Sequence, residues 1–393
     1  MSLLQISHSP DLTRLQKEGY EIEIRSDFLI VHHIPYVNSS RQVRYGKFIT
    51  VLTHAGNHRV GRPDNHVIDF MGEFPCHADG SRLTALEHGT KNQTLFEGII
   101  ANFSFSNKPR GLNNFDDYYQ KITHYVNHLL PAAQVIDPVA TPYSFRAVET
   151  KADESVFVYS DSNSARASIF HLADKFKNLN IGIVGLGGTG SYILDSVSKT
   201  PVSQIRLFDG DVLYSHNAFR YPGAASLMQV NAGQKKVEYL SEIYSRMHRG
   251  IMPHPAFITE QNLNLLTGLS YIFLCVDNNK VRKLILTYAL KHGIPVIDVG
   301  MGLQLMEDQL VGTMRTVTVS ATKNDHLLSR ISLAEEENNV YATNIQIAEL
   351  NMLNAAMAII KWKKLCGFYQ DLLDEHTTFY SLNDNLFLSQ DCV

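Results

Sequence analysis

The chain has 393 residues, with 35 Lys and Arg against 39 Asp and Glu, which gives a net charge of −4. At about 100–200 residues per domain, this length predicts two domains. Sequence-independent binding of nucleic acid requires clustered Lys and Arg side chains that neutralise phosphates. The charge balance therefore favours a protein with no nucleic-acid partner.

Hydropathy and cysteine content argue against further classes of protein. No apolar run reaches the ~20 residues that span a bilayer, and the N-terminus is too polar for a secretory signal. We therefore expect a soluble, cytoplasmic protein with no membrane partner. The four cysteines, at positions 76, 275, 366 and 392, include no Cys-x-x-Cys pair, so neither a disulfide framework nor a four-cysteine zinc site is encoded.

Residues 1–150 are predicted to form a small β-rich domain of unknown function. Short β-branched or aromatic segments alternate with turn residues, which is typical of strands. The expected strands are Tyr20–Ile24, Phe28–His32, Phe48–Leu52 and His66–Phe70. Apolar residues at helical spacing predict one helix over Asn114–Leu130, which Pro131 should end. A linker between 131 and 165 then separates this domain from the second, residues 151–393.

From Asn180 the pattern changes to alternating strands and helices. The expected strands are Ile181–Val184, Gln204–Phe208, Tyr271–Cys275 and Pro295–Val299, and the expected helices are Ser191–Ser198, Gln234–Met247 and Asn279–Lys291. Such alternation is typical of an α/β fold with a doubly wound, Rossmann-like sheet. An antiparallel strand over Leu310–Ser320 and a long helix over Asn344–Lys364 complete the prediction.

A glycine-rich turn lies between the first of these strands and the helix after it. Its glycines are Gly185, Gly187, Gly188 and Gly190. A tight glycine turn before a helix N-terminus allows the backbone to approach a phosphate, so we predict nucleotide binding. Asp209 lies 19 residues after Gly190, at the end of the next strand, where an acidic side chain can bind ribose hydroxyls. These features fit an NAD-dependent oxidoreductase equally well.

Further polar residues follow in a fixed order: Asp211, Asn217 and Arg220, then Lys236, then Asp277 with Asn278. Together with the glycine turn they resemble the adenylation motifs of the ubiquitin-activating-enzyme superfamily, the ThiF, MoeB and HesA type, over residues 165–370. The chemistry also requires these residue types, since displacement of pyrophosphate from ATP builds up negative charge.

Each motif residue receives a role from this chemistry and from the resemblance. Arg220 and Lys236 would clamp the triphosphate, and Asp277 would hold Mg²⁺. The resemblance implies that Asp209 binds the ribose of ATP and that Asn217 helps to place the phosphates. Asp211 occupies the second acidic position of the Asp-x-Asp motif that begins at Asp209. The long stretch between Arg220 and Lys236 leaves Lys235 as an alternative phosphate ligand.

The resemblance also implies a substrate and partners. The fold would be of the ThiF type, and the enzyme would adenylate the C-terminal carboxylate of a ubiquitin-like protein or sulfur carrier. It would act as a homodimer in which Arg166 reaches the partner's nucleotide. The N-terminal half resembles an uncharacterised domain from bacterial ubiquitin-like gene clusters, which suggests a conjugating-enzyme-like partner and a role in antiviral defence.

A catalytic thiol is absent from the position usual in this superfamily, because no cysteine lies between 276 and 365. Three candidates remain for a thioester: Cys76, whose pKa the adjacent His77 could lower, Cys366 at the end of the expected long helix, and Cys392 in the C-terminal tail. The simpler hypothesis is direct transfer of the adenylate to another protein's nucleophile. The sequence is also compatible with a catalytically silent ATP-binding scaffold, with an oxidoreductase, and with a peptide or tRNA as the substrate.

Overall fold

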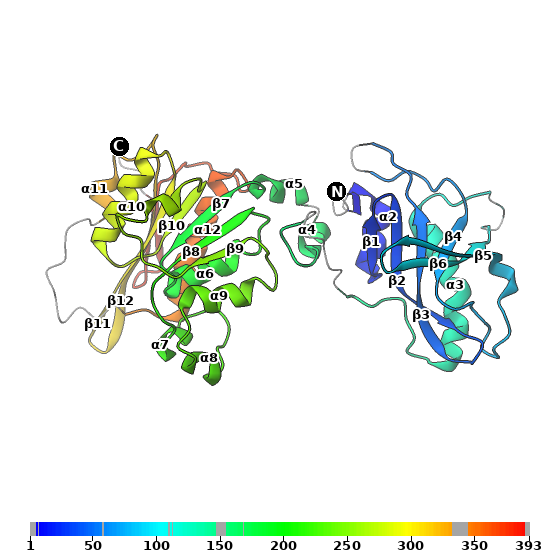
Figure 1. The fold of residues 1–393 in the computed structure, drawn as a ribbon. Coiled ribbons are helices and arrows are strands. Elements are labelled where there is room, and N and C mark those ends of the chain that lie inside the picture. Colours follow the sequence, from blue (N-terminus) through cyan, green and yellow to red (C-terminus); the bar gives the residue numbers. More distant parts are fainter. Residues whose placement is uncertain are drawn as a thin grey trace. The chain divides into compact units, whose positions relative to one another are not determined.

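The computed structural model describes residues 5–6, 8–56, 59–108, 111, 113–146, 155–167, 169–331 and 345–389. The chain forms two compact units, each shown in Figure 1. The N-terminal unit comprises Met1–Glu154 with Tyr159–Phe170, and the C-terminal unit comprises Ser155–Val158 with His171–Val393. The predicted boundary after residue 150 lies within 147–154, outside the described residues.

The N-terminal unit contains a six-stranded antiparallel sheet with the order β1-β2-β3-β4-β6-β5. Its elements are α2 (Pro10–Glu18), β1 (Ile22–Arg25), β2 (Phe28–Val37), β3 (Val43–Val51), β4 (Val67–Met71), the 3₁₀ turn Thr84–Leu86, β5 (Glu87–Phe96), β6 (Ile99–Ser106) and α3 (Tyr118–Ile136). The expectation of a β-rich α+β domain is confirmed. Helix α2 and strands β5 and β6 were not expected from the sequence.

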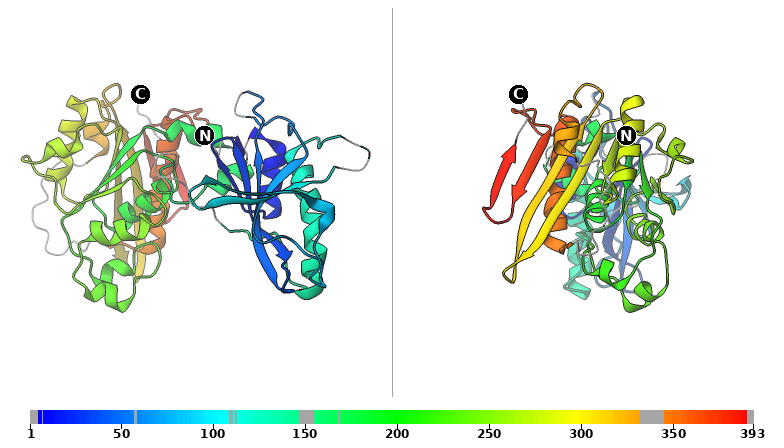
Figure 2. Two further views of the ribbon diagram at one scale, coloured as in Figure 1. Left: turned by 45° about the vertical axis from the view of Figure 1, so that its right-hand side comes forward. Right: turned by 90° about the vertical axis from the view of Figure 1, so that its left-hand side faces the viewer.

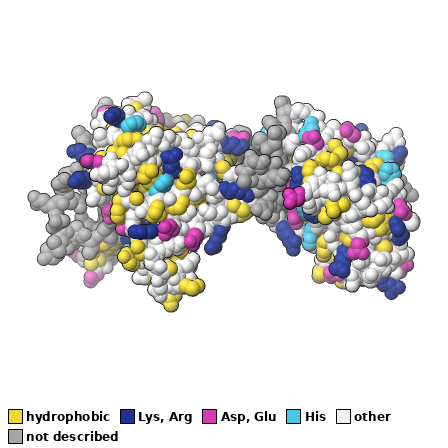
Figure 3. Space-filling view, in the orientation of Figure 1, with side chains coloured by type: hydrophobic (Ala, Val, Ile, Leu, Met, Phe, Trp, Pro, Cys, Tyr) yellow, Lys and Arg dark blue, Asp and Glu magenta, His cyan; other side chains and the backbone are white. Residues whose placement is uncertain are grey.

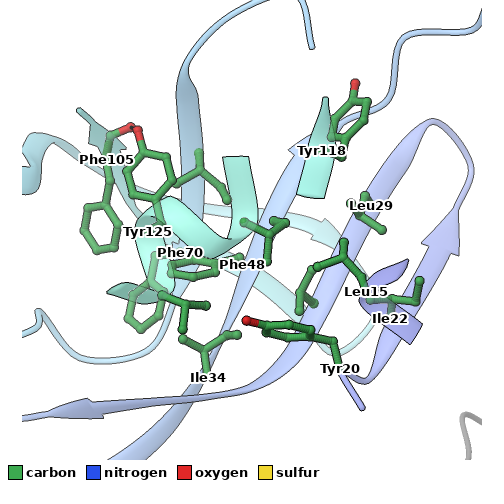
Figure 4. Packing of buried hydrophobic residues seen from close by; sticks show 14 of the residues in the cluster. Leu15, Tyr20, Ile22, Leu29, Ile34, Phe48, Phe70, Phe105, Tyr118 and Tyr125 are labelled. Atoms are coloured by element: carbon green, nitrogen blue, oxygen red, sulfur yellow. Dashed lines mark hydrogen bonds between the residues drawn. The ribbon is translucent and has the colours of Figure 1, made fainter. Parts of the chain in front are cut away.

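Aromatic and aliphatic side chains together fill the core of this unit, as Figure 4 shows. Phe70 contacts Phe48 and Phe105, with ring centroids 5.7 and 5.1 Å apart. The hydroxyl of Tyr118, in the first turn of α3, donates to the Val51 carbonyl at 2.8 Å. The Tyr118 bond, together with the contact of Tyr125 with Phe48 at 6.0 Å between ring centroids, holds α3 against the sheet.

Helix α3 begins and ends later than the sequence predicts. Asp117 caps its N-terminus by accepting the Gln120 N–H at 2.7 Å, and the helix continues through Pro131 to Ile136. Proline in a helix interior normally removes a hydrogen bond and causes a steric clash. Here Leu129 and Ala133, on either side of Pro131, are buried, so packing holds the last turn in place.

The C-terminal unit contains an eight-stranded sheet with the order β14-β13-β12-β11-β10-β7-β8-β9. Its elements are β7 (Asn180–Val184), α6 (Gly188–Val197), β8 (Gln204–Phe208), α7 (Ser215–Ala218), α8 (Leu227–Asn231), α9 (Lys236–Tyr244), β9 (Ile251–His254), the 3₁₀ turn Leu263–Leu266, β10 (Tyr271–Leu274), α10 (Asn279–Lys291), β11 (Val296–Met306), β12 (Gln309–Val319), α11 (Leu327–Arg330), α12 (Ala348–Leu365), β13 (Thr377–Ser381) and β14 (Leu386–Ser389). Before β7 along the chain come α4 (Ser162–Ala167), which belongs to the N-terminal unit, then α5 (Phe170–Ala173) and the 3₁₀ turn Asp174–Phe176.

Five of these strands are parallel and three are antiparallel additions. The parallel strands lie in the order β9-β8-β7-β10-β11, so the chain direction across the sheet reverses between β7 and β10. This is the doubly wound arrangement predicted from the sequence, and ligands bind beyond the carboxyl ends of the strands at such a reversal. In Figure 2 the long β11–β12 hairpin lies beside the β13–β14 pair.

No helix in the described parts of the chain has the length and hydropathy required to cross a membrane.

Candidate functional site

The glycine turn follows β7 at the reversal point, and two of its glycines are required by the fold. Gly185 has a φ of +89°, and a Cβ there would lie 2.6 Å from the Cys275 carbonyl oxygen. A Cβ at Gly190 would lie 2.0 Å from the Gly185 carbonyl oxygen. Because both obstacles are backbone atoms, no larger residue fits without moving the turn.

The other two glycines differ from this pair. A Cβ at Gly188 would meet the amide of Asn351, a buried side chain of α12, at 2.2 Å. At Gly187 the nearest atom is the Gln346 Oε1 at 4.0 Å, so packing against the described residues does not require a glycine. Gly187 is also the N-cap of α6. A glycine that packing does not require, at a helix N-terminus, is what close approach of a phosphate explains.

Asp209, at the end of β8, holds the glycine turn in shape. It is only 7% exposed. One carboxylate oxygen accepts the Leu186 N–H at 2.7 Å, and the other accepts the Asp211 N–H at 2.8 Å. A carboxylate has about four acceptor positions, so Asp209 retains capacity for ribose hydroxyls.

Both candidate lysines bind the Asp209–Asp211 segment. The Lys236 Nζ lies 2.6 Å from the Asp211 carboxylate and 3.8 Å from the Asp209 carboxylate, and the Lys236 side chain is 8% exposed. Lys235 donates instead to the Gly210 carbonyl at 2.5 Å. Lys236 therefore carries the buried charge that lies between two acidic groups.

Asn217 and Arg220 lie on and just after α7. The Asn217 Oδ1 accepts the Tyr214 N–H at 2.9 Å, whereas the Asn217 Nδ2 and the Arg220 Nε are buried and have no acceptor among the described residues. A buried donor without an acceptor is costly. Phosphate oxygens would satisfy both donors, so this pair fits a nucleotide triphosphate.

Tyr221 joins this segment to the glycine turn, a role that the sequence did not indicate. Its hydroxyl donates to the Leu186 carbonyl, and burial raises the pKa of Tyr221 well above its usual value. The tyrosine therefore stays neutral and keeps its donor. No motif in the sequence marks this residue, because the bond joins positions that are 35 residues apart.

Asp277 lies in the loop between β10 and α10, and its side chain is exposed. Residues 275 and 276, just before it, pack directly against Gly185. Among the described residues no group of three or more His, Cys, Asp or Glu side chains could hold a metal ion. Mg²⁺ is commonly held by one or two carboxylates together with substrate phosphates and water, and a single exposed carboxylate at this edge fits that pattern.

The remaining two candidates belong to the N-terminal unit. Arg166 is part of α4, and its side chain lies outside the described residues. Cys76 is buried, with its Sγ 3.5 Å from the Phe74 carbonyl oxygen. The expectation that His77 lowers the pKa of Cys76 is wrong, because burial raises that pKa. The thiol therefore lacks the character of a reactive cysteine.

The segment around Asn217 and Arg220 also exposes large apolar side chains. Phe219, Leu227 and Met228 are 86%, 77% and 81% exposed. Figure 3 shows hydrophobic side chains gathered over α7 and α8. Exposed apolar clusters of this kind often mark interaction surfaces.

Comparisons with known proteins divide the chain into two regions that correspond approximately to the two compact units. Residues 10–162 match a domain of unknown function (DUF6791), and residues 162–372 match the ThiF family. The tRNA threonylcarbamoyladenosine dehydratase of Haemophilus influenzae is 25% identical over 162 residues, which cover 40% of this chain and 59% of that protein. The adenylyltransferase and sulfurtransferase UBA4 of Saccharomyces cerevisiae is 28% identical over 132 residues, which cover 33% of this chain and 29% of that protein.

Among solved structures, E. coli MccB with ATP has a TM-score of 0.47 at 16% identity, covering 59% of this chain and 72% of that chain. PaaA has a TM-score of 0.45 at 18% identity, covering 57% of this chain and 76% of that chain.

The chain spans about three-fifths of the length of the dehydratase and less than a third of UBA4. The ThiF match extends over more than half of the 393 residues. The chain therefore belongs to the ThiF family, with a DUF6791 domain before the family region.

Proposed function

We propose that the protein is an ATP- and Mg²⁺-dependent adenylyltransferase that activates a substrate carboxylate. Membership of the ThiF family supports an adenylyltransferase-type enzyme. The observation that carries the proposal is the pair of buried donors without acceptors among the described residues, on Asn217 and Arg220. They lie beside a glycine turn in which no described atom comes closer than 4.0 Å to a Cβ at Gly187. This set of groups is complementary to a polyphosphate.

In the proposed reaction, a carboxylate oxygen attacks the α-phosphorus of ATP. A new P–O bond forms, the bond from the α-phosphorus to the oxygen that bridges it to the β-phosphorus breaks, and pyrophosphate leaves with the electron pair. Arg220 and Lys236 neutralise charge on the phosphates, and Asp209 orients the ribose. Mg²⁺, when bound at Asp277, supplies further positive charge to the leaving group.

The proposed substrate is the C-terminal carboxylate of a ubiquitin-like protein or sulfur carrier. The named activity of the yeast relative, adenylyltransferase and sulfurtransferase, supports this choice. Strand β11 pairs with β10 only over Val296–Asp298, and its continuation to Met306 pairs with β12 alone among the described strands. An unpaired strand edge can bind an extended peptide tail. Because ATP is the proposed co-substrate, the reaction is placed in the cytoplasm.

The proposed partners are a second copy of the chain and a conjugating-enzyme-like protein. The exposed apolar side chains around α7 and α8 support a protein contact close to the nucleotide. Arg166 of the second copy would reach the phosphates, and the DUF6791 domain would recognise the conjugating partner. In the proposed transfer the adenylate reacts directly with another protein's nucleophile, since Cys76 is buried and burial raises its pKa.

Exchange of radiolabelled pyrophosphate into ATP tests the proposal. We expect exchange that depends on a ubiquitin-like protein, and that falls by at least about 100-fold in Asp277→Asn through loss of metal binding. Asp174→Asn, which removes a surface carboxylate paired with Lys177 in the same unit, serves as the matched control and should exchange normally. ATP binding without exchange for any carboxylate substrate would contradict adenylation. Binding of NADH would instead favour an oxidoreductase.

A further inference from the structure

The loop that carries Asp277 is fixed from both sides. On its C-terminal side, the Asn278 Oδ1 accepts the N–H groups of Lys280 and Val281 at 2.9 and 3.1 Å and so caps α10. On its N-terminal side, Cys275 donates its N–H to the Val184 carbonyl at 2.8 Å. Between these two anchors, the Val276 carbonyl accepts a further hydrogen bond from outside the loop.

Arg282, in the second turn of α10, supplies that contact. Its guanidinium donates to the Val276 carbonyl, just before Asp277, and to the Asn279 side chain, just after it. A guanidinium presents five N–H donors in one rigid plane. A single side chain can therefore hold both sides of the loop at a fixed separation.

The sheet holds Arg282 in turn. The Arg282 Nε donates to the Asp298 Oδ1 at 2.9 Å, and the other oxygen of Asp298 lies 2.8 Å from the Arg315 Nη1. Asp298 is fully buried on β11, where it pairs in register with Leu274 of β10. The position of the loop is therefore set by β10, which lies at the reversal point, and by its neighbour β11.

The ion-pair network of Arg282, Asp298 and Arg315 is a costly way to stabilise the fold. Desolvation of buried charges offsets much of their attraction, and apolar replacements of similar volume are often as stable. The other polar contacts of Arg282 are with the Val276 carbonyl and the Asn279 side chain, which lie on either side of the exposed Asp277 along the chain. Beyond cohesion, the network fixes the positions of residues 276 and 279 on either side of that carboxylate.

We propose that Arg282 is a positioning residue that sets the Asp277 carboxylate in the orientation needed to hold the magnesium of Mg-ATP. This inference rests on the proposed function. Arg282 does not touch the nucleotide itself, and it acts through the backbone of residues 276–279.

The experiment compares Arg282→Lys with Arg315→Lys in the full chain. A lysine at 282 keeps the charge beside Asp298 but cannot hold two points of the loop. A lysine at 315 perturbs the same buried carboxylate without touching the loop, and so controls for loss of stability. Asn279→Ala, which removes one of the two loop contacts and leaves the ion pairs intact, is a milder third variant.

Two measurements are made on each variant. Calorimetric titration with ATP over a series of Mg²⁺ concentrations should show that Arg282→Lys needs at least tenfold more Mg²⁺ for half-maximal tightening, with ATP affinity in EDTA within twofold of the wild type. Hydrogen exchange without ligand should be at least tenfold faster for the amides of 277–279. Asn279→Ala should lie between the wild type and Arg282→Lys, and Arg315→Lys should match the wild type in both measurements.

The outcomes separate this inference from the proposed function. Wild-type Mg²⁺ dependence and loop exchange in Arg282→Lys, or an equal shift in Arg315→Lys, overturns the role of Arg282 alone. If Arg282→Lys does not fold, a wild-type Mg²⁺ dependence in Asn279→Ala overturns it. Absence of any Mg²⁺-dependent tightening in the wild type overturns the proposed function, and with it the metal role of Arg282.

Discussion

At the scale of single residues, His248 couples the stability of the C-terminal unit to pH. Its ring is fully buried, with the Nε2 3.0 Å from the Val202 carbonyl and the Nδ1 accepting the Gly250 N–H at 3.0 Å. This pair of bonds fits the neutral ring with a proton on Nε2. Burial lowers the pKa of His248 from 6.5 to about 4.

The sign of the pH effect follows from this lowered pKa. Between pH 6.5 and about 4 the unfolded chain binds a proton at His248 that the folded chain does not bind, so the free energy of unfolding falls as the pH falls. The loss should approach about 3 kcal/mol near pH 4. Urea unfolding at several pH values, in the wild type and in His248→Gln, measures it. An equally steep pH dependence in the variant would rule out His248 as its source.

At the scale of elements, the turn between β7 and α6 contains glycines with two different functions. A Cβ at Gly190 meets backbone, whereas the nearest atom to a Cβ at Gly187 is the Gln346 Oε1 at 4.0 Å. We expect Gly190→Ala to lower the free energy of unfolding by about 3 kcal/mol or more, because the turn must move. Gly187→Ala should change stability by less than about 1 kcal/mol and weaken ATP binding at least tenfold. Thermal melts and calorimetric titration of both variants check this, and unchanged ATP affinity in Gly187→Ala would show that the turn does not bind phosphate.

The elements best predicted from the sequence are those whose pattern is local. Strand β8 and helix α10 match their predicted bounds, because a buried parallel strand and an Asn-capped amphipathic helix leave clear marks in the sequence. Strand β5, Glu87–Phe96, is mostly exposed and polar, so no alternation of hydropathy marks it. Strands β13 and β14 extend the sheet through pairing with the distant β12, which no local pattern records.

The residues of the candidate site likewise divide into those that a sequence pattern marks and those that only distant contacts reveal. The glycine turn, Asp209 and Lys236 are recognisable because their order along the chain is fixed, and the structure brings them together. Tyr221 and Arg282 could not be found this way, because their roles depend on contacts with Leu186 and Asp298 that only the folded chain creates.

At the scale of the whole molecule, the C-terminal unit includes a short segment from before the family's first strand. Arg249 donates its N–H to the Val156 carbonyl at 2.7 Å, Val158 donates to the Met247 carbonyl at 2.8 Å, and the Phe157 ring lies 5.7 Å from that of His248. A fragment 155–393 should therefore bind ATP as the full chain does. A fragment 171–393 should be less stable by at least about 2 kcal/mol, mainly from the lost burial of Phe157. Urea unfolding and ATP titration of both fragments measure this, and equal stability would show that residues 155–158 add nothing to the unit.

The chain passes from one unit to the other more than once, since 155–158 belongs to the C-terminal unit and 159–170 to the N-terminal unit. A single cut of the backbone within 147–154 therefore does not release two independent pieces. The larger piece still carries α4, which is part of the compact N-terminal unit and packs beside α2. A chain nicked within 147–154 would therefore stay together as a noncovalent complex.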